Sequence, residues 1–225
     1  MRLSGFLRIV AIIFTLLATW LFTHTYFQRT GKTISIRDLL DFSSKTITEK
    51  HSRNKCNNNK KCPQDFFAFK IVSGAANVVG PSICFEDSII MSGVKNNVGR
   101  GLNIALVDGV TGVLKQHKYF DMFSGDIDIF LTFLKEIPES TLVLVASFDD
   151  PGSKLNTEAR KLLTDLGSTY AENIGFRDSW VFLGAKDFQG KSPFEQFLKN
   201  KPDENKYDGW PEALEIEGCI PRKIL

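Results

Sequence analysis

The chain has 225 residues and a formal net charge of +2, which suits one compact domain with a shorter tail. Arg2 and Arg8 account for the excess charge, since the other 26 basic residues balance 26 acidic ones. No aromatic residues interleave with the basic ones after Phe42, so the composition gives no support for nucleic-acid binding.

The first 25 residues have the layout of a secretory signal peptide. A basic front end precedes residues 9–22, IVAIIFTLLATWLF, which are 14 uncharged and mostly apolar residues. This length fits a signal-peptide core better than a membrane span, which needs about 20 residues. A signal anchor is the alternative, because residues 20–27 are bulky and offer no small-x-small cleavage site. We expect residues 1–25 to be removed and the mature chain to be secreted, without membrane attachment.

Residues 26–54 are polar, basic and without periodicity, and we interpret them as a flexible leader to a domain at residues 55–225. Residues 26–64 hold nine Lys or Arg against three Asp or Glu, a net charge of +6, whereas residues 65–225 hold 17 against 23, a net charge of −6. A solvated leader is the simpler interpretation. The alternative is a contact with sulfated glycans or an anionic membrane surface.

The domain is rich in segments that predict β-strands, because β-branched and aromatic residues are bounded by Gly, Pro, Asn or Asp. Asp108-Gly109 and Gly112 supply turn chemistry between two of these segments and predict a hairpin. The predicted strands are residues 67–73, 82–87, 102–108, 113–121, 141–148 and 179–186.

Three segments have the apolar spacing or the capping residues of helices. Residues 125–138 have Asp126 as N-cap, and residues 156–167 have Asn156 as N-cap and Gly167 as the stop. Residues 192–200, SPFEQFLKN, begin with the pattern of a capping box. Many strands with about three interspersed helices predict a mixed α/β or α+β sandwich.

The pair Gly99-Arg100-Gly101 resembles a nucleotide-binding loop, but a strand follows it instead of a helix. The third glycine of a dinucleotide fingerprint and the Gly-Lys-Ser/Thr of a P-loop are both missing. His117 is the only histidine after residue 51, which leaves little for a catalytic triad or a His-based metal site. We expect no enzymatic activity, no catalytic residue, no cofactor and no metal, and we interpret His117 as an outward strand residue.

Charged groups beside predicted strand ends remain as candidates for ligand binding. Asp149-Asp150 follows a strand and precedes Pro151, and Arg100 and Arg177 stand beside glycine and aromatic residues. An arginine fork paired with aspartate can bind hydroxyl or carboxylate groups, and loops at strand ends often bind ligands. An Asx turn at either aspartate and a structural ion pair are the alternatives. Trp180 and Trp210 are interpreted as packing residues, although such a ring can also stack on a sugar.

Four cysteines, all after the signal segment, predict two disulfides in a secreted chain. Three pairings are compatible with this count. A zinc ribbon is excluded, since no pair of cysteines stands two residues apart.

Long contiguous motifs resemble the cytokine-like family with sequence similarity three, which includes the interleukin-like inducer of epithelial–mesenchymal transition. The resemblance extends from about Lys55 to Pro221 and rests on FAFKIVSGAANVVGPSICFED, MSGVKNNVGRGLNIALVDGVTG and NKYDGWPEALEIEGCIP. Within the family, SFDDPGSK and GAKDFQGKSPFEQFLKN are most similar to the D branch. The domain also resembles the GG-type lectin domain, in which an Arg, an Asp and a second Arg hold a sugar.

The resemblance implies a secreted ligand of a cell-surface receptor with metabolic or hormone-secretion roles, for example on insulin or glucagon. It implies a compact β-β-α sandwich of two mainly antiparallel sheets with flanking helices, and the disulfides Cys56–Cys84 and Cys62–Cys219. Arg100, Asp150 and Arg177 match the sugar-binding trio, so a lectin that recognises N-acetylglucosamine-like sugars is the alternative or an additional function. One family member forms covalent dimers through an extra cysteine. Here the corresponding segment reads SWVFLGAK and has no cysteine, so a monomer is expected.

Overall fold

The computed structural model describes residues 3–30, 53–186, 188 and 190–222. By internal contacts the chain divides into two units, Met1–Ser52 and Arg53–Leu225. Most of the leader predicted at residues 26–54, with its alternative role in binding sulfated glycans or membranes, lies outside the described residues.

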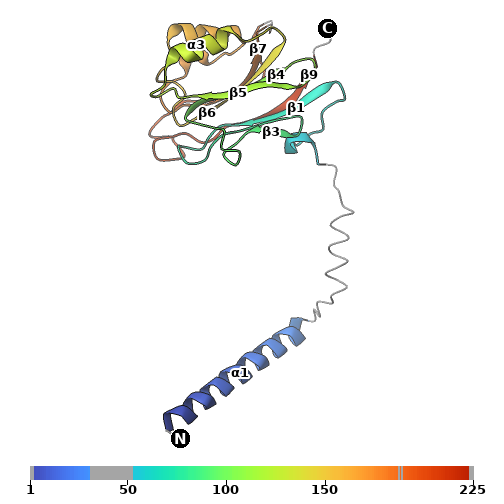
Figure 1. Cartoon of the computed structure of the whole chain (residues 1–225), viewed down its shortest axis with the longest axis vertical. Helices are drawn as coiled ribbons and strands as arrows, with labels where there is room; N and C mark the ends of the chain where they lie inside the picture. The colour runs from blue at the N-terminus through green and yellow to red at the C-terminus, as the bar shows by residue number, and fades with distance from the viewer. Residues whose placement is uncertain (1–2, 31–52, 187, 189, 223–225) are drawn as a thin grey trace. The chain divides into compact units, whose positions relative to one another are not determined.

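The first unit contains helix α1 (Leu3–Thr30), drawn in blue in Figure 1. Its stretch Arg8–Thr25 is long and apolar enough to cross a membrane by length and composition. Hydroxyl groups inside it are satisfied locally, since Thr15 and Thr19 donate to carbonyl oxygens of the preceding turn. An apolar helix at the N-terminus indicates a signal sequence, and a signal peptide and a signal anchor share this property.

The second unit contains two antiparallel sheets (Figure 1). The four-stranded sheet has the order β3-β2-β1-β9. Its strands are β1 (Phe66–Val72), β2 (Ser82–Phe85), β3 (Ser88–Met91) and β9 (Glu215–Pro221). The five-stranded sheet has the order β5-β4-β6-β7-β8. Its strands are β4 (Gly101–Asp108), β5 (Leu114–Phe120), β6 (Thr141–Phe148), β7 (Ser179–Ala185) and β8 (Glu195–Leu198).

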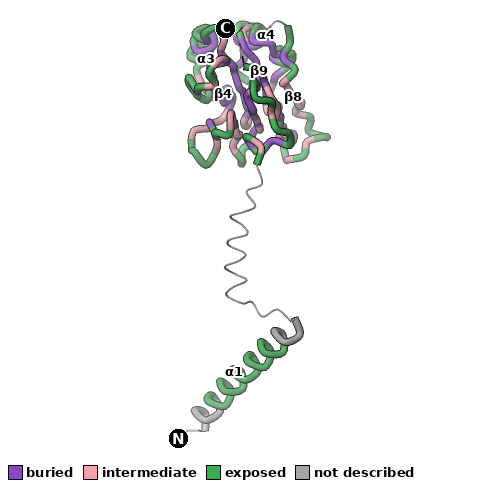
Figure 2. The backbone as a smooth tube through the Cα atoms, turned by 90° about the vertical axis from the view of Figure 1, so that its right-hand side faces the viewer, coloured by how far each residue is buried: buried purple, intermediate pink, exposed green. Residues whose placement is uncertain are grey.

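The five-stranded sheet is covered on both faces, which gives the domain three layers. One apolar cluster fills the space between the two sheets, with Ala105 and Leu144 among its members. A second cluster, with Ile104 and Val145, packs against the helices α3 (Ile127–Lys135) and α4 (Thr157–Asp165). The central strands are therefore buried along almost their whole length (Figure 2), which explains their near-continuous apolar sequences.

These features confirm the predicted mixed α+β sandwich of two antiparallel sheets. The hairpin formed by β4 and β5 is also confirmed, and Asp108 accepts hydrogen bonds from the turn. Asp126 and Asn156 cap α3 and α4 as predicted. Gly167 ends α4 with φ of +102°, and Gly167 and Ser168 donate to the last carbonyls in the pattern of a Schellman motif.

The helix predicted at residues 192–200 is wrong, because Glu195–Leu198 forms strand β8 and pairs with β7. The two residues of the expected capping box have tertiary partners instead. The Ser192 hydroxyl donates to the carbonyl of Leu183, and the Glu195 carboxylate accepts hydrogen bonds from the Thr169 amide and the Trp180 indole. Sheet pairing and these contacts override the local helix signal. Of the three helices predicted within the domain, α3 and α4 form, and both pack against the five-stranded sheet.

Two strands were not predicted, β3 and β9. The segment predicted as one strand at residues 82–87 instead ends at Phe85 and turns back through Glu86 and Asp87 into β3. Both turn residues have positive φ, of 49° and 67°, which is the conformation of a type I′ hairpin turn. Glycine and asparagine usually mark this turn, so its sequence signal is weak here.

Two disulfides tie the segment before β1 to the four-stranded sheet. Cys56 pairs with Cys84 of β2, and Cys62 pairs with Cys219 of β9, which confirms the pairing that the family resemblance implied. The second bridge spans 157 residues of sequence, so in the chain-entropy model it contributes about 5 kcal/mol to stability.

Candidate functional site

Arg100, Asp150 and Arg177 come from three neighbouring strands of the five-stranded sheet. Arg100 directly precedes β4, Asp150 follows β6, and Arg177 precedes β7. Because β6 is antiparallel to both neighbours, the start of β4, the end of β6 and the start of β7 lie at one end of the sheet. The fold thus brings the three predicted residues to the same end of the sandwich.

Arg100 is placed by the two glycines beside it. Gly101 has φ of +102°, and a Cβ there would lie 2.0 Å from the carbonyl oxygen of Phe120. A Cβ on Gly99 would lie 2.3 Å from the Tyr119 ring. The segment therefore enters β4 in close contact with β5, and no helix N-terminus follows to hold a phosphate. The glycine pair serves tight strand entry, as its sequence context indicated.

The guanidinium of Arg100 forms a two-pronged ion pair with Asp121, which follows β5. Nε lies 3.1 Å from Oδ1 and Nη2 lies 2.8 Å from Oδ2, and the guanidinium carbon lies 4.7 Å from the centroid of the Phe123 ring. The hydrogen bond to Asp121 is the main cause that raises the pKa of Arg100, and the negative charges of Asp149 and Asp150 add to it. Arg100 thus lies within electrostatic reach of both aspartates.

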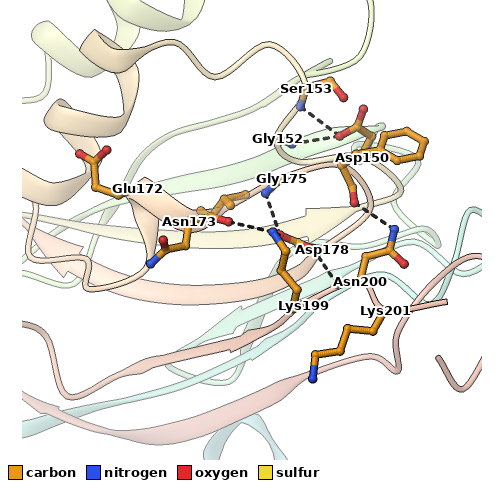
Figure 3. A network of polar contacts seen from close by, with 12 residues as sticks. Asp150, Gly152, Ser153, Glu172, Asn173, Gly175, Asp178, Lys199, Asn200 and Lys201 are labelled. Atoms are coloured by element: carbon orange, nitrogen blue, oxygen red, sulfur yellow. Dashed lines mark hydrogen bonds and ion pairs between the residues drawn. The ribbon is translucent and has the colours of Figure 1, made fainter. Parts of the chain in front are cut away.

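Asp150 is 1% exposed and ends β6 in a tight turn (Figure 3). Its Oδ1 accepts hydrogen bonds from the amides of Gly152 and Ser153, at 3.0 and 3.1 Å. This is the Asx turn that the sequence offered as one interpretation. The second oxygen, Oδ2, is buried and has no hydrogen-bond partner. The turn therefore provides hydrogen-bond donors for only one of the two carboxylate oxygens.

The Asp150 turn touches the loop that carries Arg177. A Cβ on Gly152 would lie 2.4 Å from the carbonyl oxygen of Gly175, so the two loops are in backbone contact. Asp178 fixes the Arg177 loop: it accepts a hydrogen bond from the Gly175 amide at 2.7 Å and one from the Asn200 amide at 2.7 Å (Figure 3). The backbone contact and these hydrogen bonds therefore hold the Arg177 loop against the Asp150 turn.

Arg177 is stacked on aromatic rings. Its guanidinium carbon lies 3.8 Å from the centroid of Trp210 and 4.7 Å from that of Phe176. Its Nε is buried and has no hydrogen-bond partner. The backbone of Arg177 has φ of +59°, as does that of Asp149, a conformation that is uncommon outside glycine and that gathers at binding sites.

Trp210 and Asp149 complete the cluster, and the sequence interpretation missed the role of Trp210. The Trp210 indole donates to Asp149 Oδ1 at 3.1 Å across 61 residues of sequence. By contrast, Trp180 is fully buried in the apolar core, as predicted for a packing residue. An aromatic residue beside glycine in the segment DGWP was the available signal, but nothing local placed it next to Arg177.

The end of the sheet that holds Arg100, Asp150 and Arg177, called here the Arg100–Asp150–Arg177 corner, contains both a hydrogen-bond acceptor and a hydrogen-bond donor without partners. Of four described side-chain atoms that are buried without a hydrogen bond, one belongs to Asp150 and one to Arg177. Buried polar atoms normally have partners, and a hydroxyl group can donate to a carboxylate oxygen and can accept from a guanidinium N–H. In the described parts of the chain, no three His, Cys, Asp or Glu side chains are placed so that they could hold a metal ion. His117 is exposed on β5, away from this corner.

Comparison with known proteins places the chain among relatives of similar length. The family model described as interleukin-like EMT inducer matches residues 100–188, which include the three candidate residues. The chain is 62% identical to human Protein FAM3D over 224 residues and 59% identical to mouse Protein FAM3D over 225 residues, covering 99–100% of each chain.

The chain belongs to the FAM3 family. It is 51% identical to human Protein FAM3A over 226 residues, which covers 99% of this chain and 98% of that protein. The higher identity to the two FAM3D proteins confirms the placement with the D branch. Membership supports a cytokine-like role for the chain at the level of the family. The apolar N-terminal helix and the disulfides fit an extracellular FAM3 protein.

Proposed function

We propose that this chain is a secreted cytokine-like ligand of a cell-surface receptor. The main support for this proposal is the similarity of the chain to FAM3 proteins along its whole length, from the N-terminal helix to the C-terminal strand. Regulation of metabolism or of hormone secretion, for example of insulin or glucagon, is part of this proposal and rests on the family resemblance. We propose a soluble monomer, since the four cysteines all form bridges within the chain and leave none for a covalent dimer. We also propose that it has no enzymatic activity, since His117 is the only histidine after residue 51.

Saturable binding of the secreted protein to living cells tests the receptor proposal. A labelled preparation from the culture medium should bind a limited number of sites and be displaced by unlabelled protein. A screen of cells that each express one receptor would then name the partner. Binding that never saturates would contradict the proposal. Intact mass of the same preparation tests cleavage near residue 25.

A second candidate function, glycan recognition at the Arg100–Asp150–Arg177 corner, has its own support. The buried, unpartnered Asp150 Oδ2 and Arg177 Nε are suited to a sugar hydroxyl, which can donate to the first and accept from the second. The exposed rings of Phe123 and Phe176 stand beside the two arginines and can stack on apolar sugar faces. We propose an N-acetylglucosamine-like sugar as the ligand, and binding of this sugar is compatible with binding of a glycosylated receptor.

A glycan array tests this site with variants that keep its shape. Asp150→Asn keeps the oxygen that accepts from the turn, and Arg177→Met keeps the apolar stem under Trp210. Both variants should lose glycan binding, whereas Lys201→Met, an exposed residue, should bind like the wild type. Circular dichroism establishes that each variant is folded. If the wild type binds no glycan, the lectin proposal fails and the corner is a structural brace, while the receptor proposal stands on its own test.

A further inference from the structure

The two sides of the sandwich, where the edge strands of the two sheets meet, differ. β8 and β9 meet on one side, and β3 and β5 meet on the other. On the β8–β9 side, Phe194 packs against the apolar cluster between the sheets, with its ring centroid 4.9 Å from that of Phe69. On the β3–β5 side, a groove of about 560 Å³ lies between the two edge strands. Small-molecule sites commonly have volumes of about 300–1,000 Å³, so this groove is large enough to hold a ligand.

The floor of this groove is apolar and continuous with the core. Phe85 and Ile90 line the groove, and both belong to the buried cluster between the two sheets. Ile89 of β3 and Leu114 of β5 line it as well, and they remain 41% and 40% exposed. A ligand that covers these side chains removes apolar surface from water, so the groove favours a ligand with an apolar body.

Two basic side chains line the same groove, Lys95 from the loop between β3 and β4 and His117 from β5. His117 pairs with Ala105, which packs between the two sheets, so the His117 side chain lies on that same face. Both basic residues are exposed, and within the described parts of the chain neither forms an ion pair. An ammonium group and an imidazole N–H are hydrogen-bond donors suited to an anionic head group.

Among the described residues that line this groove, only Glu86 is acidic, and its charge already has partners. The Glu86 carboxylate forms ion pairs with Lys55 and Arg222. It also accepts a hydrogen bond from the amide of Ala68 at 2.8 Å. The basic side chain of Lys95 is therefore left without a counterion in the groove, and an anionic ligand complements it.

We propose that the groove between β3 and β5 binds a single-chain anionic amphiphile, which has one acyl chain and a carboxylate or phosphate head group. The acyl chain lies against Phe85, Ile90 and Leu114. The head group accepts hydrogen bonds from Lys95 and His117, and a carboxylate and a phosphate can both do so. The groove shares no residue with the Arg100–Asp150–Arg177 corner, so this site is independent of the proposed glycan site.

Isothermal titration of the secreted protein, freed of bound lipid on a hydrophobic resin, tests the site with three probes that share a myristoyl chain. Two are anionic, myristate and myristoyl lysophosphatidate, and the third, myristoyl lysophosphatidylcholine, has no net charge. All are used below their critical micelle concentrations. At least one anionic probe should bind one-to-one and about tenfold more tightly than the neutral probe. Which of the two binds identifies the head group as carboxylate or phosphate, and binding of both shows that the site accepts either.

Variants of the protein add a matched comparison. Lys95→Glu should weaken binding of the anionic probe about three- to tenfold, by loss and reversal of an exposed charge pair. Leu114→Ser should weaken it by a similar factor of about three to ten, by loss of apolar contact. Lys118→Glu makes the same charge change on β5, but Lys118 lies on the helix face of the sheet in a different groove, and this variant should leave the affinity unchanged.

Circular dichroism establishes that each of these variants is folded. The proposal is overturned if neither anionic probe binds, if all three probes bind equally, or if Lys95→Glu leaves the affinity unchanged. Equal weakening by Lys95→Glu and Lys118→Glu would show that only the net charge of the protein matters, and would also overturn it.

Discussion

Trp210 holds Arg177 and Asp149 at the same time, although it lies 61 residues from Asp149 in the sequence. Its ring face stacks on the guanidinium of Arg177 at 3.8 Å, and its indole N–H donates to the carboxylate of Asp149 at 3.1 Å. One side chain from the segment before β9 thus fixes residues at the ends of β6 and β7. The candidate site thus depends on a contact from the segment between β8 and β9.

Two substitutions of Trp210 separate its stacking from its hydrogen bond. Trp210→Phe keeps a ring under Arg177 but removes the N–H, and we expect a loss of about 1 kcal/mol in the free energy of unfolding. Trp210→Ala removes both contacts and should cost about 2–3 kcal/mol. Denaturant unfolding measures both values. Equal losses for the two variants would show that the stack with Arg177 contributes nothing.

Asp121 should make stability depend on pH in the acid range. The Arg100 guanidinium beside Asp121 holds the pKa of that carboxyl well below its usual range, even though partial burial opposes this. A group whose pKa is lower in the folded state contributes stability above its unfolded pKa, about 3.9, and loses it as the pH falls toward the folded value. Asp121→Asn should therefore cost about 1–2 kcal/mol at pH 7 and progressively less below pH 4.

Urea unfolding of the wild type and Asp121→Asn at pH 7 and at pH 3 measures this difference. Asp203→Asn is the control, since Asp203 is exposed. Its free energy of unfolding should match that of the wild type at both pH values. A difference between the wild type and Asp121→Asn that stays constant with pH would contradict a role for the charge of Asp121.

Gly101 should tolerate no side chain. Its φ of +102° is strained for other residues, and a Cβ would lie 2.0 Å from the Phe120 carbonyl oxygen. We expect Gly101→Ala to cost more than about 3 kcal/mol or to prevent secretion. Gly93→Ala is the matched control, because nothing lies within 4 Å of a Cβ at that position. Secreted yield and thermal unfolding of the two variants should differ sharply, and similar behaviour would refute the close approach at Gly101.

The two disulfides should contribute unequally. The bridge Cys62–Cys219 closes 157 residues and the bridge Cys56–Cys84 closes 28, so the chain-entropy model gives the longer one about 1.5 kcal/mol more. The double variants Cys62→Ser/Cys219→Ser and Cys56→Ser/Cys84→Ser compare them directly. Denaturant unfolding of each protein gives the two losses. A larger loss for the shorter bridge would indicate that native-state contacts outweigh loop entropy.

Local chemistry was sufficient to predict much of the fold. The caps at Asp126 and Asn156, the stop at Gly167 and the turn at Asp108 each depend on contacts within a few residues. Alternation and apolar runs located most strands for the same reason. The cysteine count alone left three pairings open, and the family motifs supplied the one that forms.

The sequence by itself determined the two-sheet sandwich, the residues that could form a polar site, and a domain held by two disulfides. Only the tertiary structure decided that residues 195–198 form a strand, since pairing with β7 outweighs a local capping box. It also decided that Trp210 joins Arg177 and Asp149. These features depend on contacts between residues far apart in the chain, which local propensity and spacing do not encode.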